Sequence, residues 1–334
     1  MHSKLLNRHY NSVNLQEVIT SLWSGCGEIA RYKLDEKSCV VKSINVPKHI
    51  EHPRIKQSQF AINRKQQSYE VEFTWYRDYS SLLPVQSRAL ECFNTINYKQ
   101  LFALVFADFK EHGYDNATCC PEHILAIIKW LAYFHAFNLD SQADGLWQQG
   151  NYWHLSTRPD EFEKITDNEL KQAAPIIASK IQDCPFQTLI HGDAKLANFA
   201  INHQTLDVLG YDFQYVGKGI GTVDLMYFLG SCLDEKTLIT DANKYTALYY
   251  EHLGDAINYF EKSCDAQSVI EQWQSLWPDA WADFYRFLVG WSPCHWKINS
   301  YMLNQYQAVI QKINRKWFNA KADTLGNDRM WCGD

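Results

Sequence analysis

Two short polar stretches decide the fold of this chain: HGDAKLAN at residues 191–198 and DFQ at residues 212–214. The apolar runs beside the first stretch, QTLI before it and FAI after it, are typical of strands. We therefore expect residues 187–201 to form a strand, a polar loop and a second strand, and residues 206–217 to form a further short strand and turn. The polar side chains of both stretches then lie at strand ends or in loops.

Three of these side chains bring two carboxylates and an amide oxygen to the loops: Asp193, Asn198 and Asp212. Phosphoryl transfer from ATP needs a carboxylate that orients the acceptor hydroxyl and takes its proton. It also needs hard oxygen ligands that hold Mg²⁺ against the triphosphate. Each residue taken alone is equally typical of a turn, but their order and spacing together favour phosphoryl transfer.

The pattern H-G-D-x-x-x-x-N followed by D-F-Q resembles the catalytic segment of the aminoglycoside phosphotransferase and choline kinase superfamily. It is most similar to the ecdysteroid kinase-like branch, which includes bacterial members. Further similar segments follow the expected order over most of the chain: LWSGCGEIARY (22–32), CVVKSI (39–44), SYEVEFTWY (68–76), YDFQYVGKGIGTVDLMYF (211–228) and GWSPCHWKINSY (290–301). The resemblance implies a kinase that uses ATP and Mg²⁺ to phosphorylate a hydroxyl group of a small molecule.

The same resemblance implies a fold of the α+β class, the bilobal protein-kinase-like fold. A β-rich N-terminal lobe would span residues 1–108, and a mainly helical C-terminal lobe would span residues 109–334. The local patterns agree, because residues 18–46 alternate like β-hairpins and residues 101–109 form an apolar, strand-like run. We expect a loop over residues 47–66, a helix from about Gln67 to Leu83, a long buried helix after Pro121, and mostly helices from Thr222 to Lys316.

Roles in the catalytic segment follow from the resemblance, position by position. Asp193 would be the catalytic base, Asn198 and Asp212 the magnesium ligands, and Lys195 a cation that neutralises the transferring phosphoryl group. His191 and Gly192 would shape the loop. Asp224 would accept hydrogen bonds from backbone N–H groups of the catalytic loop and hold it still.

Lys42 lies in the apolar strand CVVKSI, where a lysine needs a partner or an anion. The resemblance implies that it contacts the α- and β-phosphates of ATP and pairs with a carboxylate on a helix. Glu72 is the first candidate for that carboxylate and Glu70 the second. A lysine that points to solvent from a two-sided strand is the alternative.

Gly25 and Gly27 fit a G-x-G-x-x-A pattern, GCGEIA. A dinucleotide-binding fingerprint would have a helix after the glycines, whereas here a strand follows. Strand, glycine turn and strand indicate a loop folded over phosphates, although a hairpin turn without ligand has the same pattern. The resemblance also places a hinge at residues 104–109, where backbone groups near Phe106 and Asp108 would bond the adenine edge.

The overall composition limits the partners of the chain. Its 334 residues carry a net charge of −6 without a long run of one sign, which argues against nucleic acid as the main partner. The most apolar stretch, residues 124–137, is too short to span a bilayer. We therefore expect a cytoplasmic protein without a membrane segment.

Aromatic residues in the C-terminal half leave the acceptor open. Trp273, Trp277 and Trp281 recur every four residues, which indicates a helix face packed in the core. Trp291 and Trp296 belong to a second cluster, which could hold a quaternary ammonium by cation–π attraction, suit a flat or steroid-like alcohol, or simply pack.

Two alternative functions share much of this pattern, a pseudokinase and a protein kinase. A nucleotide-binding pseudokinase that acts as an interaction module would usually lack the base or a metal ligand, and both are present here. A protein kinase is disfavoured because no A-P-E motif follows D-F-Q.

Overall fold

The N-terminal lobe is built on a five-stranded antiparallel sheet in a computed structural model that describes residues 5–22, 25–45, 59–98 and 101–327. The strand order is β1-β2-β3-β5-β4, and the strands are β1 (Val13–Ser21), β2 (Gly27–Leu34), β3 (Lys37–Asn45), β4 (Cys92–Tyr98) and β5 (Leu101–Ala107). The hairpin pattern of residues 18–46 is confirmed, although β1 begins earlier than residue 18. Strand β4 was not predicted from the sequence.

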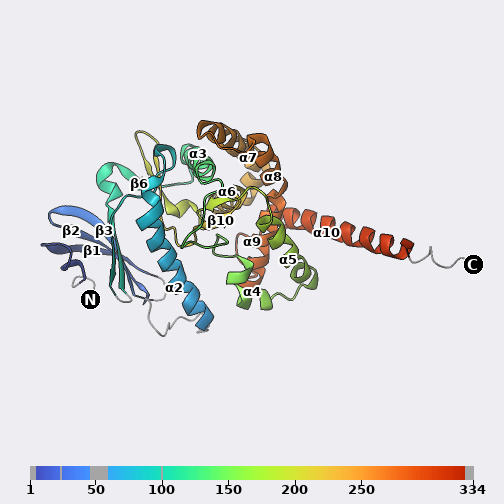
Figure 1. Cartoon of the computed structure of the whole chain (residues 1–334), viewed down its shortest axis with the longest axis horizontal. Coiled ribbons are helices and arrows are strands. Elements are labelled where there is room, and N and C mark those ends of the chain that lie inside the picture. The colour runs from blue at the N-terminus through green and yellow to red at the C-terminus, as the bar shows by residue number, and fades with distance from the viewer. Residues whose placement is uncertain (1–4, 23–24, 46–58, 99–100, 328–334) are drawn as a thin grey trace, which may run out of the picture.

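Helix α2 (Gln59–Thr74) packs beside this sheet and continues into a π-helical turn at Trp75–Tyr79 (Figure 1). The helix therefore begins eight residues before the predicted start at Gln67. The prediction of a loop for residues 47–66 is wrong for residues 59–66, and residues 47–58 lie outside the described part. The first turn of α2 contains Phe60, Ala61 and Ile62, but these apolar residues are consecutive and polar residues follow them, so no apolar stripe of helical period marks the start.

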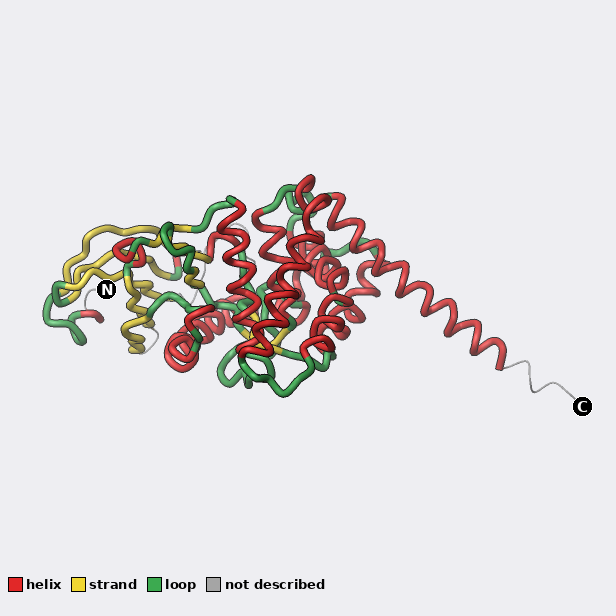
Figure 2. The backbone as a smooth tube through the Cα atoms, turned by 90° about the horizontal axis from the view of Figure 1, so that it is seen from above, coloured by secondary structure: helices red, strands yellow, loops and turns green. Residues whose placement is uncertain are grey.

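The C-terminal lobe is mainly helical, so the α+β class and the division into a β-rich and a helical lobe are confirmed (Figures 1 and 2). Its helices are α3 (Pro121–Phe137), α4 (Pro159–Glu163), α5 (Asn168–Gln182), α6 (Gly221–Cys232), α7 (Glu235–Tyr259), α8 (Ala266–Ser275), α9 (Trp277–Trp291) and α10 (Ser300–Asn327). Its short strands are β6 (Tyr114–Asn116), β7 (Thr188–Ile190), β8 (Phe199–Asn202), β9 (Val208–Gly210) and β10 (Gly217–Gly219). The C-terminal end of α10 projects away from the body of the lobe.

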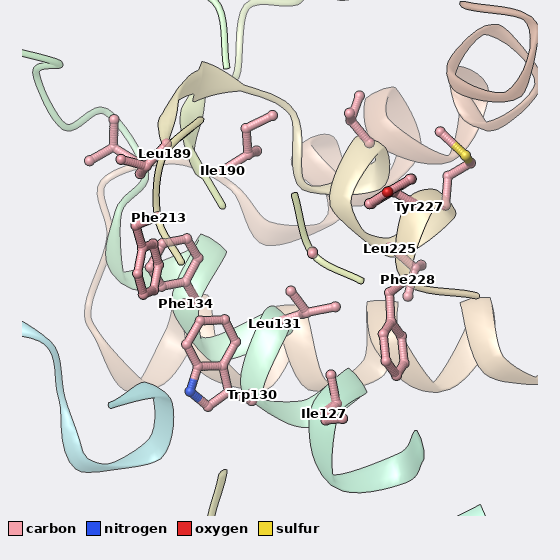
Figure 3. Close-up of a cluster of buried hydrophobic side chains, with 14 of the residues drawn as sticks. Ile127, Trp130, Leu131, Phe134, Leu189, Ile190, Phe213, Leu225, Tyr227 and Phe228 are labelled. Carbon is pink, nitrogen blue, oxygen red and sulfur yellow. The ribbon is translucent and has the colours of Figure 1, made fainter. Parts of the chain in front are cut away.

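The core of this lobe contains buried aromatic and aliphatic side chains, among them Leu189 and Ile190, which directly precede the first polar stretch, and Phe213 of the second (Figure 3). Phe213, the middle residue of DFQ, is fully buried, and its ring centroid lies 4.7 Å from that of Trp75 and 4.4 Å from that of His191. Full burial of a phenylalanine contributes about 2–3 kcal/mol. The DFQ turn is therefore anchored by its apolar member, while its polar members, Asp212 and Gln214, are hydrogen-bonded to each other at 2.7 Å.

Two tryptophans of the four-residue repeat are core residues, as predicted. Trp273 and Trp281 are buried, and Trp277 is half-buried. They do not share one helix, because α8 ends at Ser275 and Trp277 begins α9.

Among the helices of the described residues, none combines the length and the apolar character needed to cross a bilayer.

Candidate active site

A cleft of about 680 Å³ brings together residues from distant parts of the sequence. Lys42 of β3 and Glu72 of α2 line it from the N-terminal lobe, while Asp193 and Asp212 line it from the loops after β7 and β9. Lys195, Phe106 and Asp108 also lie on its wall. The candidate base, the candidate metal ligand and the strand lysine therefore face one space.

Lys42 is held by two carboxylates at the back of the cleft. Its Nζ lies 2.7 Å from Glu72 Oε2 and 2.8 Å from Asp212 Oδ1, and the lysine is 5% exposed. Burial lowers the pKa of Lys42, but the charges of Asp212 and Glu72 outweigh burial and raise this pKa above its ordinary value. Lys42 is therefore a buried, permanent cation.

Glu72, rather than Glu70, is the helix partner of Lys42. Glu70 is exposed and accepts a hydrogen bond from Gln66 Nε2 at 2.9 Å. Glu70 and Glu72 are two positions apart in the sequence, which on a helix places them about 200° apart around the axis. Only one of the two can therefore face the sheet.

Asp212 has a left-handed backbone with φ = 67°, which Asp and Asn tolerate better than most residues. Its Oδ1 accepts hydrogen bonds from Lys42 Nζ at 2.8 Å and Gln214 Nε2 at 2.7 Å. Burial raises the pKa of Asp212, but the charges of Lys42 and Lys195 hold it below its ordinary value. The carboxylate is thus ionised, as a metal ligand must be.

The carboxylate of Asp193 forms hydrogen bonds with two other polar side chains of its loop, those of Lys195 and Asn198. Its Oδ2 accepts hydrogen bonds from Lys195 Nζ at 2.8 Å and from Asn198 Nδ2 at 3.1 Å. Asn198 Nδ2 also donates to the Asp193 carbonyl at 2.8 Å. Since the amide nitrogen of Asn198 faces Asp193, the amide oxygen is the atom that remains for a metal ion.

Asp224 holds the backbone of this loop through hydrogen bonds to its side chain. Its carboxylate accepts hydrogen bonds from His191 N at 2.5 Å, Gly192 N at 2.9 Å and His135 Nε2 at 3.1 Å, and it has no exposed surface. Gly192 has φ = 77°, and a Cβ there would lie 2.0 Å from the Tyr215 carbonyl oxygen. The backbone conformation of the loop at residue 192 therefore requires glycine.

Replacing Asp224 with alanine should destabilise the fold by about 3–5 kcal/mol, because buried N–H donors lose their acceptor. Urea unfolding of the purified variant would measure the loss. Asp255→Ala, on the exposed face of α7, is the matched control, and we expect it to change stability by less than about 0.5 kcal/mol. Equal stability of both variants would contradict a supporting role for Asp224.

The glycine turn and the predicted hinge contribute differently to the cleft. Gly27 has φ = 139°, and a Cβ there would meet the Ser43 carbonyl oxygen at 1.9 Å, so β2 starts where only glycine fits. Gly25 has φ = 68° and open space around it. Neither glycine lines the cleft in the described residues, in contrast to Leu22 and Ile29 of the same hairpin, and residues 23–24 of the turn lie outside the described part.

The hinge residues Phe106 and Asp108 do line the cleft. The Asp108 side chain is engaged by Arg31 Nε, and its backbone carbonyl accepts a hydrogen bond from Glu111 N at 3.0 Å. The carboxylate and the backbone carbonyl of Asp108 therefore both have hydrogen-bond partners within the protein.

Several residues near the site were not singled out from the sequence. Gln214 bonds Asp212 and also accepts a hydrogen bond from Lys65 Nζ at 3.2 Å. Its place in D-F-Q was the available signal. Tyr227 is buried beside the base, and its pKa lies well above the ordinary value because of burial and then the charge of Asp193.

The donor set fits magnesium bound together with a triphosphate. Within the described residues no three or more His, Cys, Asp or Glu side chains cluster in a way that could hold a metal ion alone. Asn198 and Asp212 would supply two hard oxygens, which suits Mg²⁺ because this ion commonly takes its other ligands from phosphates and water.

Comparison with known proteins agrees with this geometry. The model of the ecdysteroid kinase-like family matches residues 142–261, which contain both polar stretches. No curated protein matches the sequence. A choline kinase structure from Cryptosporidium parvum superposes with a TM-score of 0.53 at 8% identity, over 93% of this chain and 91% of its own.

An ethanolamine kinase structure from Plasmodium vivax gives a TM-score of 0.51 at 14% identity, over 92% of this chain and 85% of its own. At these identities the likeness shows the fold alone. The chain has the bilobal fold of these kinases, and the family model supports the resemblance to the ecdysteroid kinase-like branch over residues 142–261.

Proposed function

We propose that this chain, which has the fold of choline and ethanolamine kinases, transfers the γ-phosphate of Mg-ATP to a hydroxyl group of a small molecule. The observation that carries the proposal is the meeting of Lys42, Asp193 and Asp212 in one cleft, with Asn198 bonded to Asp193. These residues come from separate segments, so a chance meeting of turn residues is a poor explanation. We place the boundary between the lobes near residue 108.

Each side chain has a role that its surroundings support. Lys42 is a fixed buried cation that would bind the α- and β-phosphates, and Glu72 orients it from α2. Asp212 and Asn198 would hold Mg²⁺, which when bound neutralises charge on the phosphates. Phe106 and Asp108 would lie against the adenine, and the turn at Gly25 and Gly27 would cover the phosphates.

Asp193 would orient the acceptor hydroxyl and take its proton as the new O–P bond forms. Lys195 lies 2.8 Å from this carboxylate, and its own pKa is raised by Asp193 and Asp212 in spite of burial. It therefore remains a cation at neutral pH. That charge would stabilise the negative oxygens of the transferring group.

An ATP-consumption screen tests this proposal. Purified protein with Mg-ATP is offered amino alcohols, aminoglycosides, sugars and sterols, and ADP is measured. We expect ADP formation that depends on one class of acceptor and stops when EDTA removes the metal. Binding of Mg-ATP without consumption with any acceptor would instead support the pseudokinase.

A further inference from the structure

An aromatic cluster beside the candidate base already contains a cation of the chain itself. The cluster consists of Tyr227, Phe284 and Trp296, and it surrounds the ammonium group of Lys297. Lys297 Nζ lies 4.5 Å from the ring centroid of Tyr227, 5.7 Å from that of Phe284 and 5.6 Å from that of Trp296. These distances lie within the range of cation–π attraction.

The cluster adjoins Asp193, where the acceptor hydroxyl would have to lie. The ionisation of both Tyr227 and Lys297 responds to the charge of Asp193. Tyr152 extends the cluster, since its hydroxyl donates to the Tyr227 hydroxyl at 3.1 Å. The ammonium group of Lys297 therefore occupies the position in the aromatic cluster where the head group of a quaternary ammonium alcohol would bind.

The charges around this space are mainly positive. Asp193 faces Lys297 but is already paired with Lys195 at 2.8 Å. Throughout the described residues, no carboxylate oxygen forms an ion pair with Lys297 within 4 Å. Arg158 lies 5.7 Å from the ring of Tyr152, and its charge is paired with Glu161 at 3.5 Å. A cationic acceptor would meet like charges here without a spare carboxylate to bind it.

We infer that the acceptor is a hydroxyl compound without a fixed positive charge, and that Lys297 excludes quaternary ammonium alcohols from the aromatic cluster. The inference rests on the proposed function, because it names the substrate class of the same site. Like charges close together in a partly desolvated site repel strongly, which makes Lys297 a repulsive element of specificity. The segment GWSPCHWKINSY therefore does not favour a choline-like acceptor, because its own Lys297 lies where the cation of such an acceptor would bind.

Choline and 3,3-dimethylbutan-1-ol provide a matched pair of probes, because they share shape and differ in one charge. Ligand-observed NMR titrations would measure their binding to wild type, Lys297→Met and Lys297→Arg. We expect Lys297→Met to gain at least about tenfold in affinity for choline, with little change for the neutral alcohol. Lys297→Arg keeps the charge and should behave like wild type.

Equal affinity of wild type and Lys297→Met for choline, including undetectable binding to both, would overturn the inference. So would a wild-type preference for choline over its neutral counterpart. Because these are binding measurements, they do not depend on phosphoryl transfer. A failed ATP-consumption screen would therefore defeat the proposed function, whereas an unchanged choline affinity would defeat only the assignment of Lys297.

A pH titration of unmodified protein provides a second test that needs no variant. Burial lowers the pKa of Lys297 to about 8. The groups that face it are Asp193, Lys195, Cys232, Tyr227 and His295. Burial and then the charge of Lys297 lower the pKa of His295, so this ring stays neutral above pH 7. The pKa values of Lys195, Cys232 and Tyr227 are raised by their surroundings, so these three keep their charge state as Lys297 loses its proton.

Choline affinity of the wild type should therefore rise as the pH passes from about 7 to about 9, since choline itself keeps its charge. The affinity for 3,3-dimethylbutan-1-ol should stay constant over the same range. A choline affinity that does not depend on pH in the wild type would contradict the inference.

Discussion

Asp193→Asn will lower phosphoryl transfer by about 10²–10⁴-fold, the usual contribution of a positioned general base. Asparagine has the same shape as aspartate and can still accept a hydrogen bond from Lys195, but it cannot take a proton from the acceptor hydroxyl. Binding of Mg-ATP should change little, because in the proposed site Lys42 would bind the phosphates and Asp212 would bind the metal ion. Initial rates with the best acceptor of the screen, together with nucleotide binding by calorimetry, would measure both effects.

Asp255→Asn is the control for this variant, because Asp255 is exposed on α7, outside the residues that line the cleft. It should transfer phosphate at the wild-type rate. Comparable turnover of Asp193→Asn and wild type would remove Asp193 from the mechanism. Loss of nucleotide binding in Asp193→Asn would show that the residue acts on the nucleotide rather than on the acceptor.

Asp212→Asn will abolish the stabilisation that Mg-ATP gives to the protein. Ligand at about 100 times its dissociation constant stabilises a fold by about 2.7 kcal/mol, which raises the melting temperature by several degrees. Asparagine keeps the left-handed backbone at φ = 67°, where alanine would add strain. The variant loses the negative charge that would hold Mg²⁺, while Lys42 keeps Glu72 as its partner.

Thermal shift with ATP, with Mg-ATP and with Mg-ATP plus EDTA would separate the contribution of the metal. Wild type in EDTA should resemble the variant in Mg²⁺, because either change removes the bound cation. An undiminished Mg-ATP shift in Asp212→Asn would assign the metal to other residues.

Much of the N-terminal lobe could be predicted because its strands alternate and are separated by turns. The hairpins of β1, β2 and β3 follow from this pattern, and the helix Pro121–Phe137 follows from its apolar length. The start of α2 and the strand β4 could not be predicted. Their residues mix polar and apolar side chains without a clear helix or strand period and are mostly half-exposed or exposed, so packing against β5 and against the rest of the lobe decides their conformation.

Some features of the candidate site could likewise be predicted from the sequence, and others required the structure. The spacing of Asp193, Asn198 and Asp212 predicted that carboxylates and an amide would come from loops at strand ends, because local order along the chain is enough for that. The choice of Glu72 over Glu70 needed the contact between α2 and β3, since both carboxylates belong to the same polar helix.

By itself, then, the sequence indicated a β-rich part followed by a helical part and placed Asp193, Asn198 and Asp212 in loops at strand ends, because the periodicity of nearby residues is local. The bilobal kinase-like fold and the proposed chemistry of these loops followed from the resemblance of the motifs. Only the tertiary structure decided which side chains meet across the cleft. The position of Lys297 among the rings of Tyr227 and Phe284 is the strongest example. These rings are contributed by α6 and α9, and the distance between separate helices is set by packing, which no local pattern contains.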